Sequence, residues 1–136
     1  MKFISIDNIE NNSRIKEFFK NELKISNINE VYTYYKEESN KLCIVVKNGK
    51  IVGLIGISIV KNKIIIKHIA VEKNMQRTRL GENIVKKLLI DYPSFYIEAE
   101  TDKDSVGFYR YLDFQITSLG EKYPGVTRYK CILKPS

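Results

Sequence analysis

Two apolar runs joined by Lys47-Asn48-Gly49-Lys50 constrain the fold of this chain more than any other feature. Asn-Gly between apolar runs is the strongest short-range indication of a β-hairpin. A third run, KNKIIIKHIAV at residues 61–71, follows directly. Its long apolar character is typical of a strand that is covered on both faces. Residues 41–71 therefore predict three consecutive antiparallel strands.

The apolar spacing on either side of these strands predicts further strands and helices. Upstream we expect a short strand at 2–7, a helix within 12–25 and a second, ambiguous helix within 27–40. Downstream we expect a helix from Arg79 to Pro93, a strand at 94–100, a short helix within 102–114, and strands at 114–120 and 126–133. Asp102 or Asp104 is available as the N-cap of the short helix. This order predicts a mixed α/β domain with helices on both faces of one central sheet.

Length and composition predict one folded domain spanning residues 1–136. The chain has 43% hydrophobic residues, and no linker or internal repeat divides it. No apolar run reaches about 18 residues, so no membrane span or membrane partner is expected. The first residues turn polar too soon for a secretory leader. We therefore expect a cytoplasmic protein.

The net charge of +7 permits a nucleic acid, an anionic membrane or an anionic cofactor as partner. The lysines are scattered among glutamates and no nucleic-acid-binding motif is present, so no nucleic-acid partner is expected. A lysine-rich composition without functional meaning remains an alternative. Cys43 and Cys131 are expected to be reduced, buried thiols. One histidine and no C-x-x-C leave no spacing for zinc, and no metal is expected.

The junction at residues 76–81 has the character of an anion site. A strand feeds there into a helix start, whose N–H groups lack internal partners and whose dipole favours negative charge. Arg77 and Arg79 add donors suited to phosphate, and Gly81 permits close approach of the backbone. A solvated basic turn is the alternative. The junction lacks a Walker loop and a dinucleotide fingerprint.

Three segments, in order, give the chain its resemblance to the GNAT superfamily of N-acetyltransferases. They are IAV at 69–71, QRTRLG at 76–81 and ETDKDSVGFYRYLDF at 100–114. The second resembles the family's Q/R-x-x-G-x-G/A loop for the pyrophosphate of acyl-CoA, and the third its F-Y-x-x-x-G-F helix. The resemblance is good over residues 42–114 and implies a single, mostly antiparallel mixed sheet flanked by helices on both faces.

Two departures from the family pattern matter. Arg79 stands where the loop usually has its first glycine, and it either crowds the pyrophosphate or turns outward to pair with it. Asp113 stands where the helix motif has its glycine, which we interpret as a change at the helix end.

The resemblance implies direct transfer of an acetyl group from acetyl-CoA to an amine. The implied cofactor-binding residues are Ile69, Ala70, Val71, Gln76, Arg77, Thr78, Arg79, Leu80, Gly81, Glu82 and Tyr109. Tyr109 is also the implied proton donor to the CoA thiolate, and the N–H of Val71 the implied oxyanion donor. A core tyrosine is the alternative interpretation of Tyr109.

The base that takes the ammonium proton is expected to be Glu98 or Glu100, which share one strand face, acting through water. A solvated strand edge is the alternative. His68 is a competing base, although a lone histidine in an apolar strand is more often packed and hydrogen-bonded. Tyr32, Tyr34 and Tyr35 either wall an acceptor pocket or pack along a helix face.

The main hypothesis is an acetyl-CoA-dependent N-acetyltransferase acting on a primary amine of a small molecule or a protein. The alternative is a catalytically weak module of the same fold that binds acyl-CoA or a protein partner. Tyr123, in a loop between two strands, is a candidate contact to the acceptor or to a second subunit, so a homodimer is left open.

Overall fold

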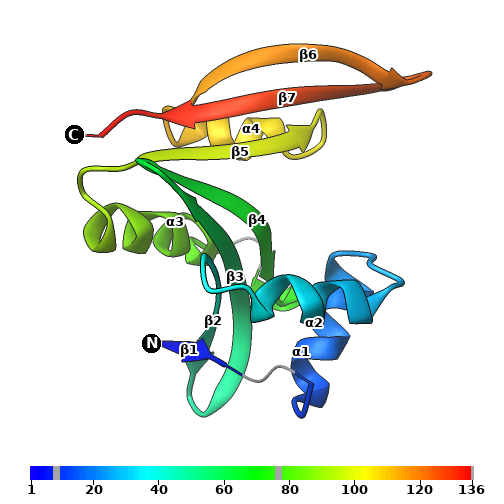
Figure 1. The fold of residues 1–136 in the computed structure, drawn as a ribbon, viewed down its shortest axis with the longest axis vertical. Coiled ribbons are helices and arrows are strands. Elements are labelled where there is room, and N and C mark those ends of the chain that lie inside the picture. The colour runs from blue at the N-terminus through cyan, green and yellow to red at the C-terminus, as the bar shows by residue number, and fades with distance from the viewer. Residues whose placement is uncertain (8–9, 76–77, 136) are drawn as a thin grey trace.

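The computed structural model describes residues 1–7, 10–75 and 78–135, which form a seven-stranded sheet with helices on both faces (Figure 1). The strands are β1 (Lys2–Ile6), β2 (Asn40–Lys47), β3 (Lys50–Val60), β4 (Lys63–Val71), β5 (Tyr96–Asp102), β6 (Gln115–Tyr123) and β7 (Val126–Leu133). Their order in the sheet is β1-β2-β3-β4-β5-β7-β6. Every neighbouring pair is antiparallel except β4 and β5. The predicted fold class and element order are confirmed.

The Asn-Gly turn joins β2 to β3 as predicted. Asn48 and Gly49 have φ angles of 53° and 76°, the left-handed values that a tight two-residue hairpin turn requires. Burial differs from the prediction, because β3 is the strand buried on both faces, from Val52 to Ser58. In β4 only Ile64, Ile66 and Ala70 are buried. The second half of β4 is more open because its neighbour on one side diverges from it.

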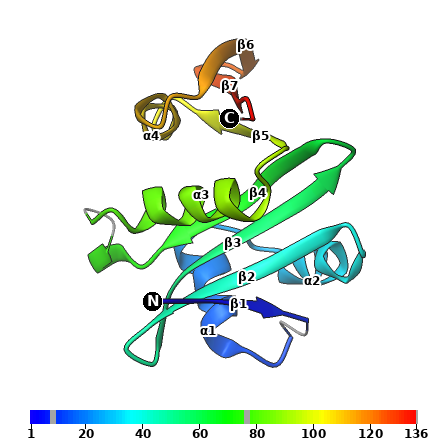
Figure 2. The ribbon, with the colours of Figure 1, turned by 90° about the vertical axis from the view of Figure 1, so that its left-hand side faces the viewer.

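The helices divide between the two faces of the sheet. They are α1 (Ser13–Glu17), the π-helical turn η1 (Phe18–Glu22), α2 (Ile28–Lys36), the 3-10 turn η2 (Lys73–Met75), α3 (Leu80–Asp91) and α4 (Val106–Tyr111). Figure 2 shows α3 on one face and α1 and α2 on the other. Buried residues of α3 and α4 share one hydrophobic cluster, and those of α1, η1 and α2 share a second. The sheet therefore separates two cores.

The helix predicted within residues 12–25 is interrupted after its first turn. The N–H of Leu23 bonds to the carbonyl of Phe18 at 3.1 Å, which is the wider spacing of a π-turn. This widening places Phe18 and Phe19 together in the core, both with 0% exposure. No helix in the described part of the chain is long and apolar enough to cross a membrane.

The two parallel strands β4 and β5 pair over only half of their length. Their pairing runs from Lys63 with Tyr96 to Ile66 with Ala99 and then ends. At the same point the register between β3 and β4 shifts, which leaves Lys67 as a β-bulge. Beyond it, β4 remains paired with β3 while β5 continues with β7 (Figure 1). The sheet is thus open between the second halves of β4 and β5.

Candidate active site

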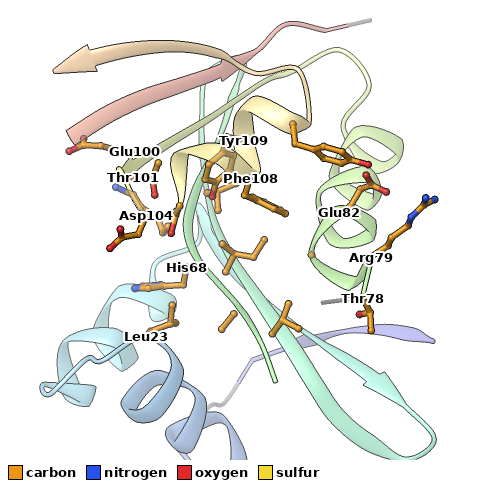
Figure 3. A pocket seen from close by; sticks show the side chains of 18 residues that line it. Leu23, His68, Thr78, Arg79, Glu82, Glu100, Thr101, Asp104, Phe108 and Tyr109 are labelled. Carbon is orange, nitrogen blue, oxygen red and sulfur yellow. The ribbon is translucent and has the colours of Figure 1, made fainter. Parts of the chain in front are cut away.

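A cleft of about 770 Å³ occupies the opening between β4 and β5. Residues 66–71 of β4, Glu100 and Thr101 of β5, and the first turn of α3 contribute to its walls. Phe108 and Tyr109 reach it from α4, while Leu23 reaches it from the end of η1. Figure 3 shows Phe108 and Tyr109 on one side of this opening and Leu23 and His68 on the other. The cleft therefore has a wall formed by α3 and α4 and an opposite wall beside α1 and α2.

The first turn of α3 lies in the cleft wall, as the sequence predicts for an anion site. The Thr78 hydroxyl accepts a hydrogen bond from the Leu80 N–H at 3.3 Å and donates one to the Met75 carbonyl at 2.6 Å. Leu80 is buried and anchors the helix start to the core. Gly81 and Glu82 follow in the same wall, in a turn where a helix has no internal acceptors for its N–H groups. Gln76 and Arg77 lie outside the described residues.

Arg79 adopts a conformation that does not require glycine. It is the N-cap of α3 with φ of −83°, so an arginine at this position introduces no left-handed strain. Its side chain extends away from those of Tyr109 and His68 in Figure 3. Arg79 is thus a lining residue of the cleft whose side chain is directed away from its centre.

Gly81 has a packing role that the sequence did not reveal. A Cβ added to it would lie 3.2 Å from Cε1 of Phe108, so the bare backbone of α3 makes room for the α4 aromatic ring. Glu82, the next residue, ion-pairs with Lys86 at 3.4 Å, and its side chain is 12% exposed. The glycine thus allows α3 and α4 to pack closely enough to form one wall.

Tyr109 lies deep in this wall. It is 5% exposed, and its ring packs edge-on against Phe108 and Phe114 at centroid distances of 5.1 and 5.2 Å. Burial, with a smaller contribution from Cys131, raises the pKa of its phenol. Tyr109 lines the cleft, and its hydroxyl has no hydrogen-bond partner among the described residues. Tyr109 therefore presents a protonated phenol to the cleft.

Asp113 preserves the turn that the family builds with glycine. Its φ is 68°, and aspartate is one of the few residues that adopt left-handed angles readily. The N–H of Phe114 bonds to the carbonyl of Tyr109, and the N–H of Asp113 to that of Arg110, both at 3.1 Å. These two bonds close α4 with a Schellman motif. The turn also seats Phe114 against Tyr109.

The backbone of β4 supplies donors to the opening. The Glu72 N–H bonds to the Val52 carbonyl of β3 at 2.8 Å. N–H groups alternate in direction along a strand, so those of Val71 and Ile69 point the opposite way, to the side from which β5 has diverged. The side chains of both residues pack against the α3 and α4 core, while Ala70 packs in the other core. Residues 69–71 thus combine apolar walls with inward-pointing N–H groups.

Glu98 and Glu100 share one face of β5, opposite the buried Ile97 and Ala99, as predicted. Only Glu100 contributes to the cleft wall. Glu98 lies between Lys63 and Lys130, with its Oε1 3.5 Å from each Nζ, and its side chain is 16% exposed. That oxygen is buried and has no hydrogen-bond partner among the described residues.

The carboxylate of Glu100 is held by two cations. It accepts hydrogen bonds from Lys122 at 3.1 Å and from Arg128 at 3.4 Å. The bond from Lys122 is the main cause that holds the pKa of Glu100 below its usual value; burial opposes it, and the bond from Arg128 adds to it. A carboxylate with a lowered pKa is a weak proton acceptor.

The opposite wall contains a pair of residues that sequence reasoning did not connect. The Tyr35 hydroxyl of α2 lies 2.6 Å from Nδ1 of His68 on β4. A Cβ on Gly56 of β3 would fall 1.6 Å from that hydroxyl oxygen, so the glycine provides the space in which the pair forms. Burial, and secondarily Lys67, lowers the pKa of His68 to about 4. His68 is therefore packed, hydrogen-bonded and neutral.

No group of three or more histidine, cysteine, aspartate or glutamate side chains in the described ranges is arranged to hold a metal ion. Cys131 is buried and Cys43 half-buried, both as free thiols.

Comparison with known proteins identifies both a family and a fold. Residues 8–127 match the family model described as the acetyltransferase (GNAT) domain. Among solved structures, the ribosomal-protein-S18-alanine N-acetyltransferase of Escherichia coli superimposes with a TM-score of 0.79 at 16% identity, covering 99% of this chain and 94% of the other. A GNAT family acetyltransferase of Elizabethkingia anophelis with acetyl-CoA bound gives 0.71 at 16% identity, covering 98% and 97%.

An aminoglycoside 6'-N-acetyltransferase complexed with coenzyme A gives a TM-score of 0.74 at 16% identity, covering 100% of this chain and 98% of the other. No curated protein sequence matches this chain closely enough to count as a relative. At these identities the solved structures show a shared fold.

Proposed function

Because this chain belongs to the GNAT family of acetyltransferases, we propose that its cleft transfers an acetyl group from acetyl-CoA to a primary amine. The observation that carries the proposal is the opening between β4 and β5, which brings three features to one cavity. These are the N–H groups of β4, the first turn of α3 and the phenol of Tyr109. Two of the structural neighbours hold acetyl-CoA or CoA on this fold.

The residues of the α3 and α4 wall fit the acyl donor. We propose that the pantetheine arm runs along Ile69, Ala70 and Val71, whose N–H groups at 69 and 71 point into the opening. The diphosphate would then meet the start of α3 at Gly81 and Glu82, where helix N–H groups and the helix dipole favour an anion. Gln76, Arg77, Thr78, Arg79 and Leu80 complete the predicted contact segment. Arg79, turned outward, adds positive charge without filling the cleft.

The reaction divides into three proton and charge movements. The acceptor ammonium first loses a proton, since only the neutral amine has a lone pair with which to attack the thioester carbon. Negative charge then develops on the thioester oxygen, and we assign its stabilisation to the N–H of Val71. The C–S bond breaks as the amide forms, and Tyr109 donates its proton to the departing thiolate. The amine nitrogen loses its second proton in this step, and that proton restores the phenol of Tyr109. The products are the acetylated amine, CoA thiol and one released proton.

Glu100 is the carboxylate that we propose as the proton acceptor, acting through water. It lines the cleft, whereas Glu98 is held between two lysines outside the lining. The low pKa of Glu100 makes it a weak base, so its contribution to the rate is expected to be small. Glu98 is kept as the weaker candidate.

The proposed function is tested by acetyl-CoA binding and amine-dependent thiol release. Acetyl-CoA at 100 times its dissociation constant should stabilise the fold by about 2.7 kcal/mol, measured as a thermal shift. Thiol release on a panel of amines should follow. A thermal shift without thiol release would favour the alternative, a catalytically weak module that binds acyl-CoA or a protein partner. The absence of any shift, even at low salt, would refute the proposal.

We also propose that residues 1–136 form a single domain, that the protein is cytoplasmic, and that the acceptor amine belongs to a small molecule or a protein. A homodimer is left open. Tyr123, 70% exposed at the end of β6, is positioned for contact with another molecule.

A further inference from the structure

The imidazole of His68 is held by contacts from two elements, η1 and α2. Its ring packs edge-on against Phe19 of η1, with centroids 5.1 Å apart, and near Tyr34 of α2 at 6.4 Å. Tyr35 holds Nδ1 at 2.6 Å, and Gly56 leaves the space that Tyr35 occupies. The β-bulge at Lys67 sets the face of the sheet on which His68 emerges. These ring contacts and the hydrogen bond give the His68 side chain one defined orientation.

The hydrogen bond between Tyr35 and His68 has a preferred direction. Burial, and secondarily Tyr34, raises the pKa of Tyr35, so its phenol keeps its proton. If Tyr35 accepted a proton from Nδ1, its own O–H would have no partner among the described residues, which is costly for a largely buried group. If Tyr35 donates to Nδ1, its single proton is used. The neutral imidazole must then carry its own proton on Nε2.

Nε2 points away from Tyr35, because the two ring nitrogens of an imidazole point in divergent directions and Nδ1 is bonded to Tyr35. His68 lines the cavity, and Figure 3 shows its ring lying between Leu23 and Asp104. Nε2 has no hydrogen-bond partner within the described ranges, and it is not one of the buried unpaired atoms found there. Because His68 lines the cavity, its N–H donor lies in the wall opposite Tyr109.

We propose that Tyr35 and His68 form a recognition site for an oxygen atom of the acceptor, in which the Nε2–H of His68 donates a hydrogen bond to a carbonyl beside the reacting amine. This inference rests on the proposed function, because it deepens the acceptor side of the same cleft. It gives the acceptor a chemical class: an amine with an adjacent carbonyl oxygen, as in an amino-acid amide or a peptide N-terminus. A simple alkylamine offers no partner to Nε2–H.

In the tautomer that carries its proton on Nε2, this nitrogen cannot act as the base. A nitrogen that already carries a proton has no lone pair for an ammonium proton, and Nδ1 is occupied by Tyr35. His68 is therefore a binding residue for the acceptor, and Tyr35 is a positioning residue that acts through it.

The tautomer can be read directly because the chain contains one histidine. Protein labelled with ¹⁵N-histidine gives one pair of ring-nitrogen signals by NMR, with no assignment ambiguity. We expect a protonated Nε2, an unprotonated Nδ1 and no second protonation at pH 7. Tyr35→Phe should leave a mixture of tautomers, while Tyr34→Phe, which keeps the Tyr35 hydrogen bond, should not. An Nδ1–H tautomer or an imidazolium at pH 7 in the unaltered protein would overturn the proposal.

The acceptor class is tested with two amines of similar size on CoA-saturated protein. Alaninamide carries a carbonyl beside its amine, and isopropylamine does not. We expect the His68 Nε2 signal to shift with alaninamide alone. The KM for alaninamide should also be lower than for isopropylamine by roughly threefold to tenfold, the ratio that one neutral hydrogen bond produces. Tyr35→Phe should remove that difference at unchanged acetyl-CoA affinity, and Tyr34→Phe should keep it.

The outcomes separate the two proposals. A shift with both amines or with neither would refute acceptor recognition by His68. A lack of acetyl-CoA binding would instead refute the proposed function, while the tautomer measurement would still report on the Tyr35–His68 pair.

Discussion

The two walls of the cleft are built in different ways. The wall formed by α3 and α4 uses backbone N–H groups of β4 and of a helix start, together with one phenol, that of Tyr109. The wall beside α1 and α2 uses side chains that meet over long sequence separations, such as Tyr35 and His68. The first wall suits an acyl donor, which is the same molecule in every turnover. The second wall can be adapted to a particular acceptor amine, because only a few side chains form it.

The largest expected effect lies in the α3 and α4 wall. Tyr109→Phe keeps the ring against Phe108 and Phe114 but removes the hydroxyl, so turnover should fall about 100-fold, as for loss of a general acid. Acetyl-CoA affinity should stay unchanged, because the ring still fills the wall. Steady-state kinetics and a binding titration check both. Tyr92→Phe, which likewise removes a hydroxyl from a ring packed against a phenylalanine but lies outside the cleft lining, is the matched control. Normal turnover in the Tyr109 variant would refute the donor role.

Gly56→Ala should damage the opposite wall. The new Cβ would fall 1.6 Å from the Tyr35 oxygen, so Tyr35 must move away from His68. We expect a loss of stability of about 1–3 kcal/mol, as for overpacking in a core, and the same loss of preference for alaninamide as in Tyr35→Phe. Denaturant unfolding and amine kinetics measure these.

The control for this variant is Gly107→Ala in α4, where a Cβ meets nothing within 4 Å. It should not lower stability. A Gly56→Ala protein that keeps full stability and full preference for alaninamide would contradict the packing described for Tyr35.

The effect of Arg79 should be smaller and dependent on salt. If its outward side chain attracts the diphosphate, Arg79→Ala should weaken CoA binding by roughly threefold to fivefold at low salt and less at high salt. Titration calorimetry at two salt concentrations measures this. Lys87→Ala removes the same charge near the other end of α3 and should leave affinity unchanged. Tighter binding in the Arg79 variant would show that arginine crowds the site.

The smallest effect is expected at Glu100. Its folded pKa lies below its usual value of 4.5, so its ion pairs stabilise the fold above that pH and are lost as the pH falls through the folded pKa. Glu100→Gln should therefore reduce stability at pH 7 by at most about 1 kcal/mol, because the side chain is exposed and screened. The difference from the unaltered protein should shrink as the pH falls below 4.5 and through the folded pKa of Glu100. If the difference in stability between the two proteins grew as the pH fell, the assignment of a lowered pKa to Glu100 would be wrong.

The α3 and α4 wall was largely predictable from the sequence because its features are local. The strand-to-helix junction at 76–81 and the F-Y motif each lie within a few residues. The role of Gly81 was not predictable, because its neighbour Phe108 comes from another helix.

The wall beside α1 and α2 was not predictable in the same way. Three tyrosines in one segment did not indicate which of them reaches His68, because that depends on the β-bulge and on the space at Gly56. A glycine within the strongly apolar β3 was the one available signal, since such a residue often marks a close approach. The separation of Glu98 from the cleft likewise depends on where β4 and β5 cease to pair.

The central claim is that acetyl-CoA enters the opening between β4 and β5 from the side of α3 and α4. A crystal structure with bound CoA tests it most directly. We expect the diphosphate within hydrogen-bond distance of the N–H groups at the start of α3, the pantetheine arm along residues 69–71, and the sulfur beside the Tyr109 hydroxyl. A diphosphate bound elsewhere, or a cleft filled by the Arg79 side chain, would contradict the account.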